Sequence, residues 1–162
     1  MYCLHLNALA INQDLGQSLH TGATITLEYA AENETTITME ASAHDSSTLG
    51  NLGRIVFSFN KFTKDGYIDR LHVSKDKRGS SYGSMLLRFA LTKLTSLRCK
   101  AVYWQACPYD LHAHQTQENM LPKLIKFYQR HGAQLLFQSD YSARMVYYPA
   151  VYTTWREQFH NF

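Results

Sequence analysis

The sequence predicts an α/β protein of the α+β kind, in which helices flank one mixed, mostly antiparallel sheet. Segments in which apolar and polar residues alternate come first along the chain, and segments with helical spacing appear only later among them. Turns rich in Gly, Ser, Asp and Asn separate these segments. A chain of 162 residues is long enough for one domain with a real core. We therefore expect one domain over residues 1–162, with its core at about residues 23–148 and a tail at 149–162.

The composition is that of a folded and lightly charged protein, with 45% hydrophobic and 18% charged residues. No apolar run approaches the length of a membrane span and no signal peptide is visible, so no membrane partner is expected. Cys3, Cys99 and Cys107 are odd in number and lack the close spacing of metal ligands. They fit a reducing compartment, which predicts a cytoplasmic location. A net charge of +3 is mild and does not demand a nucleic acid.

The first half of the chain is predicted to consist mainly of strands. Residues 1–21 are the least regular and predict a short strand at Tyr2 to Leu6, followed by an irregular or helical segment. Residues 44–53 are rich in Ser, Gly, Asp and Asn and are predicted to form a loop. Two-residue alternation predicts four further strands, at residues 23–30, 35–41, 54–59 and 66–73. The first two of these strands are predicted to form a hairpin over Glu32-Asn33-Glu34.

The second half is predicted to begin with an amphipathic helix at residues 84–97 and a strand at 100–107. A polar loop at 109–118 leads to a second helix at 119–131, which Gly132 ends. A closing hairpin pairs residues 134–138 with 143–148. The tail at 151–162 carries Trp155 and Phe159 at helical spacing, so we expect it to dock either on the body or on a second subunit of a homodimer.

The stretch from Val73 to Ser84 forms a tight turn. It joins the strand predicted at residues 66–73 to the helix predicted at 84–97. It holds two glycines, several serines and three basic side chains. Small residues let a ligand approach the backbone closely, and the amides at a helix start point outward from its positive end. The stretch therefore predicts a cradle for phosphate groups, in which Arg78 adds charge-assisted hydrogen bonds.

Two motifs of this chain resemble those of the GNAT acyltransferase superfamily. Arg78-x-x-Ser81-x-Gly83-Ser84 resembles its acyl-CoA loop, in which Arg or Gln, two residues, Gly, one residue, and Gly or Ala follow one another; Ser81 replaces the first glycine. Phe127-Tyr128-Gln129-Arg130-His131-Gly132 resembles its second signature, a helix that ends in Tyr-x-x-x-Gly. Ala133 follows where an aromatic residue is usual. The resemblance covers about residues 53–148 and implies an acyl-CoA N-acyltransferase-like fold.

The resemblance implies an acyl-CoA-dependent N-acyltransferase. The expected reaction is direct transfer of acetyl from acetyl-CoA to a primary amine of a small molecule or a protein, and no metal is implied. In the family, the fourth and fifth strands are parallel neighbours that splay apart, and the pantetheine arm of the cofactor pairs with the fourth strand. The implied cofactor-binding residues are Leu71, His72, Val73, Arg78, Gly79, Ser80, Ser81, Tyr82, Gly83 and Ser84.

Acyl transfer to an amine needs a base, a donor for the developing oxyanion and an acid for the departing thiolate. Tyr128 matches the family tyrosine that often serves as the acid, although it also lies on the apolar stripe of its helix and so reads equally as a core aromatic residue. The base is open between Asp69 and His72. A structural ion pair with an arginine is the other reading of Asp69, and simple packing is that of His72. Alternation along the strand places Tyr67 and Asp69 on one face, and Arg70 and His72 on the other.

Other readings stay open. His112 and His114 suggest a metal, but no third ligand is apparent, so a solvated loop is favoured. Cys107 is favoured as a small buried hydrophobic residue over a covalent role.

The family usually has two helices between its first two strands, and here at most residues 7–21 are available for them. A non-catalytic acyl-CoA-binding regulatory protein is therefore the alternative function. A nucleic-acid module is the weakest reading, because its basic residues cluster on one turn.

Overall fold

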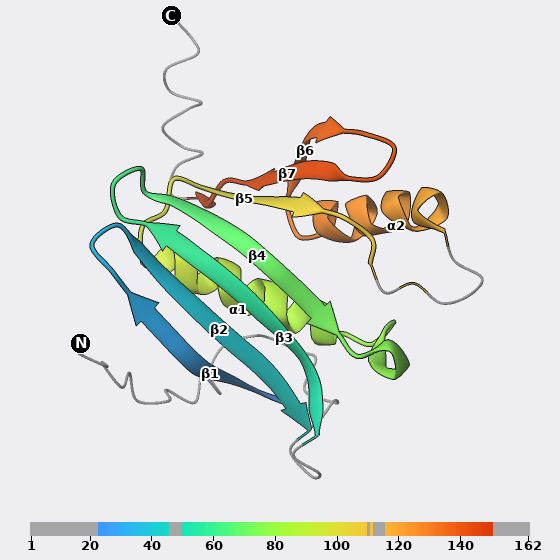
Figure 1. Ribbon diagram of the computed structural model, residues 1–162, viewed down its shortest axis with the longest axis horizontal. Helices are drawn as coiled ribbons and strands as arrows, with labels where there is room; N and C mark the ends of the chain where they lie inside the picture. Colours follow the sequence, from blue (N-terminus) through green and yellow to red (C-terminus); the bar gives the residue numbers. More distant parts are fainter. Residues whose placement is uncertain (1–22, 46–49, 110, 112–115, 151–162) are drawn as a thin grey trace, which may run out of the picture.

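The computed structural model describes residues 23–45, 50–109, 111 and 116–150. In this part of the chain, seven strands form one sheet with the order β1-β2-β3-β4-β5-β7-β6 (Figure 1). All neighbouring strands are antiparallel except β4 and β5, which confirms the predicted mixed, mostly antiparallel sheet. The elements are β1 (Ala23–Glu32), β2 (Thr36–Asp45), β3 (Asn51–Asn60), β4 (Asp65–Val73), the 3₁₀ turn η1 (Lys75–Lys77), α1 (Tyr82–Ser96), β5 (Ala101–Ala106), α2 (Gln117–Gln129), β6 (Gln134–Gln138) and β7 (Ala143–Tyr147).

The predicted hairpin at the start of the described chain is confirmed, but its strands are longer than the sequence suggested. The side chain of Asn33 shapes its turn, since Oδ1 accepts from the amides of Thr35 and Thr36 at 2.9 and 2.7 Å. The loop predicted at residues 44–53 is wrong at both ends, because β2 runs to Asp45 and β3 starts at Asn51. Polar side chains do not prevent strand pairing when the backbone finds its partners there. The predictions for residues 1–21 and for 151–162 lie outside the described residues.

Both helices lie on the same face of the sheet, behind it in the view of Figure 1. The apolar stripe of α1 is fully or nearly fully buried and consists of Leu86, Leu87, Ala90, Leu91 and Leu94. It packs mainly on β3 and β4, whereas α2 packs on β5, β6 and β7. The stripe is what holds α1 in place, since replacing one such leucine with alanine typically lowers stability by about 2–5 kcal/mol. In the described part of the chain, the opposite face of the sheet carries no helix.

An extra residue interrupts the pairing of β4 with β3. Val56 lies opposite Arg70 and Phe57 lies opposite Ile68, which leaves Asp69 without a partner of its own. Such a β-bulge shifts the side-chain alternation by one residue on one strand. Residues beyond the bulge therefore point to the face opposite to the one that simple alternation predicts.

The bulge corrects the predicted faces of β4. Residues opposite each other on paired strands share a face, and Tyr67 and His72 lie opposite Ser58 and Arg54. These two partners alternate with the buried core residues of β3, so they lie on the face away from the helices. Tyr67, Arg70 and His72 thus share this face, and the prediction that Arg70 and His72 lie across the sheet from Tyr67 is wrong. A two-residue alternation along one strand does not show where a bulge inserts an extra residue.

Candidate functional site

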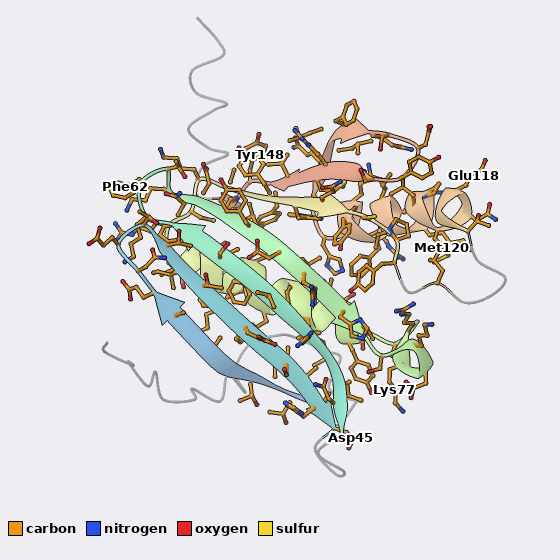
Figure 2. The ribbon with its side chains drawn as sticks, in the orientation of Figure 1. Asp45, Phe62, Lys77, Glu118, Met120 and Tyr148 are labelled. Carbon is orange, nitrogen blue, oxygen red and sulfur yellow. The ribbon has the colours of Figure 1, made fainter. Side chains whose placement is uncertain are left out.

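A cleft opens where β4 and β5 stop pairing. The two strands pair only at Asp65–Ala101, Gly66–Val102 and Tyr67–Tyr103, and then diverge. The cleft has a volume of about 1330 Å³. That exceeds the roughly 300–1,000 Å³ of common small-molecule sites, so an extended ligand fits. Residues of α2 also line the cleft, among them Met120. Figure 2 labels Met120, and it labels Lys77 in the turn that follows β4.

Most of the predicted cofactor-binding residues line this cleft. They are Leu71, His72, Val73, Arg78, Gly79, Ser80, Ser81, Gly83 and Ser84. Tyr82 is not among the lining residues, because its side chain is partly buried against the core. Its predicted contribution is a backbone amide, and that stays a prediction. The strand end, the turn and the helix start thus form one continuous wall.

The turn between β4 and α1 is compact and carries its arginine inward. Arg78 donates from Nε to the carbonyl oxygen of Val73 at 3.2 Å, so its side chain folds back over the end of β4. Gly79 has φ +85°, a conformation that other residues rarely adopt. A Cβ built on Gly79 would meet no atom within 4 Å, so glycine is required here by the backbone and not by a lack of space. The turn therefore leaves room for a ligand beside its backbone.

Helix α1 begins at Tyr82, two residues before the predicted start. Its N-cap, Ser81, makes no capping hydrogen bond with its side chain, and the first helical hydrogen bond runs from the Met85 amide to the Ser81 carbonyl at 2.9 Å. The amides before Met85 have no partner within the helix and point toward the positive end of its dipole. A helix start of this kind is suited to bind an anion.

Gly83 lies in the first turn of α1, close to side chains of β4 and α2. A Cβ at Gly83 would lie 3.5 Å from Cγ2 of Val73 and 3.6 Å from Cζ of Phe127, which are ordinary contact distances. A methyl group therefore fits here, whereas a branched side chain would project into the cleft wall between β4 and α2.

Tyr128 belongs to the hydrophobic core and also lines the cleft. It is only 6% exposed, and its ring centroid lies 5.2 Å from that of Trp104. Burial raises the pKa of the Tyr128 hydroxyl well above its usual value, and the nearby Tyr109 raises it further. The hydroxyl thus keeps its proton at neutral pH. The indole N–H of Trp104 is buried and finds no hydrogen-bond partner in the described part of the chain.

The two candidate bases also line the cleft. Asp69 is the extra residue of the bulge. Burial raises the pKa of its carboxyl, and a hydrogen bond with the Ser58 side chain opposes this shift. Asp69 as a whole is exposed, and it lines the cleft. No ion pair to Asp69 is present among the described residues, so the predicted alternative of a pair with arginine finds no support there. His72 stacks on Tyr109, with ring centroids 6.1 Å apart and an interplanar angle of 25°.

The cationic or titratable side chains of the cleft that sequence reasoning missed include Arg88, Arg130 and His131. Arg88 follows Ser84 by four residues on α1, so helical spacing could have found it. Nε2 of His131 lies 3.0 Å from Oγ of Ser84. Burial lowers the pKa of His131, and the positive charges of Arg88 and Arg130 lower it further. This end of the cleft is therefore basic.

Two further predictions concern residues near β5. Cys107 is exposed, so its expected burial is wrong: the strand ends at Ala106, one residue before it. His112 and His114 lie outside the described residues. Among the residues that the structure does describe, no group of three or more His, Cys, Asp or Glu side chains could hold a metal ion. The described helices are also too short or too polar to cross a membrane.

The cleft fits the pantetheine and phosphate groups of an acyl-CoA. Its walls include an open strand edge at Leu71 to Val73, helix-start amides beside Ser84, and the side chain of Arg78. The backbone amides suit an amide-containing arm, and the helix start with the arginine suits phosphates.

Comparisons with solved structures give the fold. Nourseothricin acetyltransferase is 16% identical over 68% of this chain and 65% of its own, with a TM-score of 0.54. An acetyltransferase from Bacillus cereus is 16% identical over 70% of this chain and 74% of its own, with a TM-score of 0.55. A spermidine N-acetyltransferase variant from Vibrio cholerae is 13% identical over 74% of this chain and 69% of its own, with a TM-score of 0.55. The chain thus spans about two thirds to three quarters of the length of these proteins.

No curated protein is significantly similar to this chain in sequence. The sequence model of the acetyltransferase (GNAT) family, however, matches residues 51–133, which is just over half of the chain. The matched region contains β3, the bulged β4, the turn, α1, β5 and α2, and thus most of the elements that line the cleft. The chain therefore belongs to the acetyltransferase (GNAT) family.

Proposed function

We propose that this protein transfers an acetyl group from acetyl-CoA to a primary amine of a small molecule or a protein by direct attack. The observation that carries the proposal is the divergence of β4 and β5 after Tyr67–Tyr103, because the cleft beyond it is lined by all the predicted cofactor-binding and catalytic residues except Tyr82. The neighbouring structures named nourseothricin acetyltransferase and spermidine N-acetyltransferase have the same fold, which is consistent with an amine acceptor.

The chain would hold acetyl-CoA along one wall of the cleft. Backbone groups of Leu71 to Val73 would pair with the pantetheine arm, as a peptide pairs with an open strand edge. The amides from Gly79 to Ser84 and the guanidinium of Arg78 would hold the pyrophosphate. When bound, acetyl-CoA supplies a thioester whose acetyl group passes to the amine while coenzyme A leaves as a thiol.

Tyr128 is the proposed acid. Tyr128 lines the cleft and carries its proton at neutral pH, and Oη would donate that proton to the departing sulfur. Burial raises the pKa of this hydroxyl, which makes it a weaker acid than an ordinary tyrosine, so the proton would pass only as negative charge develops on the sulfur. The ring is buried in the core, where it contacts the rings of Trp104 and Phe127, and these contacts limit the directions in which the hydroxyl can point. An amide of the Leu71 to Val73 segment is the proposed donor to the carbonyl oxygen.

Asp69 is the proposed base, and His72 is the second candidate. A carboxylate whose pKa is raised accepts a proton from an ammonium group more readily than an ordinary one. The bulge places Asp69 at the point where the cleft opens, on the side of the sheet that in the described residues carries no helix. We infer that the amine enters from that side.

Mass spectrometry of the purified protein with acetyl-CoA and a panel of amines, polyamines and peptides tests the proposal. We expect one acceptor class to gain an acetyl group in the parent and to remain unmodified with a double variant, Asp69→Asn with Tyr128→Phe. Tight binding of acetyl-CoA without turnover on any acceptor would instead support a non-catalytic regulatory protein. Failure of acetyl-CoA to bind at all would exclude both.

We further propose that the protein is cytoplasmic and that it forms a homodimer. The cytoplasmic location is supported by the cysteines, since Cys99 and Cys107 are free thiols. Sedimentation of the full chain with and without acetyl-CoA would test the homodimer.

A further inference from the structure

His131 is fixed in place at the phosphate end of the cleft. The chain turns sharply there, since the amide of Ala133 donates to the carbonyl of Tyr128 at 3.2 Å and Gly132 has φ +84°. The imidazole packs edge-on against the ring of Phe127, with centroids 5.0 Å apart. Its Nε2 lies 3.0 Å from Oγ of Ser84, in the first turn of α1. The ring thus joins the end of α2 to the helix start that would hold the pyrophosphate.

The charges around His131 are all positive. Arg88 acts on it from α1 and Arg130 from the end of α2, and Arg78 lines the same cleft from the turn. The positive end of the α1 dipole has the same sign. Among the described residues that line the cleft, Asp69 is the single carboxylate, and it belongs to β4. Burial, Arg88 and Arg130 together lower the pKa of His131, so without a ligand its imidazole gives up its proton more readily than an ordinary histidine does.

We propose that His131 is a cofactor-binding residue that holds the phosphates through Ser84 and takes up a proton as they bind. The inference rests on the proposed function, because it requires an acyl-CoA in the cleft. A bound pyrophosphate reverses the sign of the local field, and an opposite charge within about 4–6 Å favours the protonated form of a histidine. Protonated His131 donates from Nε2 to Oγ of Ser84, and the Ser84 hydroxyl then turns its own proton toward a phosphate oxygen.

Titration calorimetry with 3′-dephospho-coenzyme A tests this inference. This ligand keeps the pyrophosphate but lacks the phosphate monoester, whose own pKa of about 6 would confuse the proton count. Binding is measured between about pH 6 and pH 8, around the usual pKa of histidine, in pairs of buffers with different ionisation enthalpies. The dependence of the observed enthalpy on the buffer gives the number of protons taken up.

We expect the parent to take up part of a proton on binding and to lose affinity as the pH rises. Each unit by which binding raises the pKa of His131 corresponds to about a tenfold change in Kd across the range. His131→Gln keeps an amide that can contact Ser84 but cannot titrate, so its uptake should vanish and its Kd should not vary with pH. The imidazole signal that disappears from the NMR spectrum of His131→Gln belongs to His131. In the parent protein, titration of this signal should give a higher pKa when the ligand saturates the site than when no ligand is present.

Equal proton uptake in the parent and in His131→Gln would overturn the inference while leaving the proposed function intact. An unchanged pKa of the His131 ring on saturation would do the same. If neither acetyl-CoA nor 3′-dephospho-coenzyme A binds to the parent at any pH, the proposed function and this inference both fail.

Discussion

The hydroxyl of Tyr109 donates a hydrogen bond of 2.6 Å to the carbonyl oxygen of Leu71. This bond ties the segment after β5 to β4 beyond the point where the two strands stop pairing. Two residues further along β4, the carbonyl of Val73 accepts from Nε of Arg78 at 3.2 Å. Both carbonyls therefore face the open edge of β4, where the pantetheine arm would pair, and both already accept a side-chain donor.

Tyr109→Phe should strengthen binding of acetyl-CoA. The substitution keeps the ring that stacks on His72 and removes only the hydroxyl, so the Leu71 carbonyl becomes available to a ligand amide. A hydrogen bond of this kind has a net worth of about 0.5–1.5 kcal/mol, which corresponds to roughly a two- to tenfold lower Kd. Titration calorimetry of the parent and the variant measures it. Weaker binding by Tyr109→Phe would show that the hydroxyl contacts the ligand itself.

Gly83 tests the proposed phosphate cradle through a pair of substitutions. Gly83→Ala adds a methyl at ordinary contact distance from Val73 and Phe127, so it should fold and retain most of its affinity for acetyl-CoA. It should also stabilise α1 by about 0.5–1 kcal/mol, because alanine loses less entropy in a helix than glycine does. Gly83→Val places a branched, stiff side chain at the same point, and we expect it to weaken binding by at least about tenfold. Thermal melts of both variants show whether the fold is kept, and parent-like affinity of a folded Gly83→Val would contradict the cradle.

Ser81→Gly restores the family pattern in the turn. Ser81 has φ −76° and makes no capping bond, so neither the backbone nor the helix start requires a serine at this position. Glycine removes a Cβ that lines the cleft but adds entropy to the free loop. We expect equal or tighter binding of acetyl-CoA, by no more than about 1 kcal/mol. A large loss of affinity in calorimetry would identify the Ser81 hydroxyl as a ligand of the phosphates.

Asp69 should set the acid side of the pH–rate profile. A base acts only when deprotonated, so kcat/KM should rise as the pH rises through the pKa of Asp69. Since burial raises this pKa, the rise should occur at a higher pH than for an ordinary carboxyl group. The hydrogen bond with the Ser58 side chain lowers the pKa, and Ser58→Ala should therefore move the rise to still higher pH. Asp69→Asn should abolish this acid limb, and a limb that survives in Asp69→Asn would point to His72 instead.

The sequence predicted the elements that bury a regular stripe of side chains. The leucines of α1 and the alternation in β3 recur at fixed spacing, and burial selects for exactly that kind of repetition. The turn between β4 and α1 was also predictable, because its small residues stand at adjacent positions in the sequence. Among the described residues, the ends of β2 and β3 were not predicted, since polar residues fill them without disturbing backbone pairing.

The three-dimensional site was less accessible from sequence. The bulge at Asp69 depends on how β4 aligns with β3, and no local pattern records that alignment. The contact between His131 and Ser84 joins residues 47 positions apart, so only the fold, which brings the chain after α2 beside the start of α1, makes it possible. Arginine residues such as Arg88 look like solvent-exposed charges until the cleft beside them is known.

Tyr128→Phe separates catalysis from packing. The substitution keeps the buried ring and its contact with Trp104 and removes only the proposed proton donor, so fold and cofactor affinity should be nearly unchanged. The turnover rate should fall by about ten- to a thousandfold, and by less if a step other than chemistry limits it. A purely structural Tyr128 would behave in the opposite way, because losing a buried hydroxyl contact lowers Tm while turnover per folded molecule stays normal. Thermal melts and turnover must therefore be measured on one preparation of Tyr128→Phe. Unchanged turnover would leave water or a backbone group as the acid, and the raised pKa of the Tyr128 hydroxyl would then be a consequence of its burial alone.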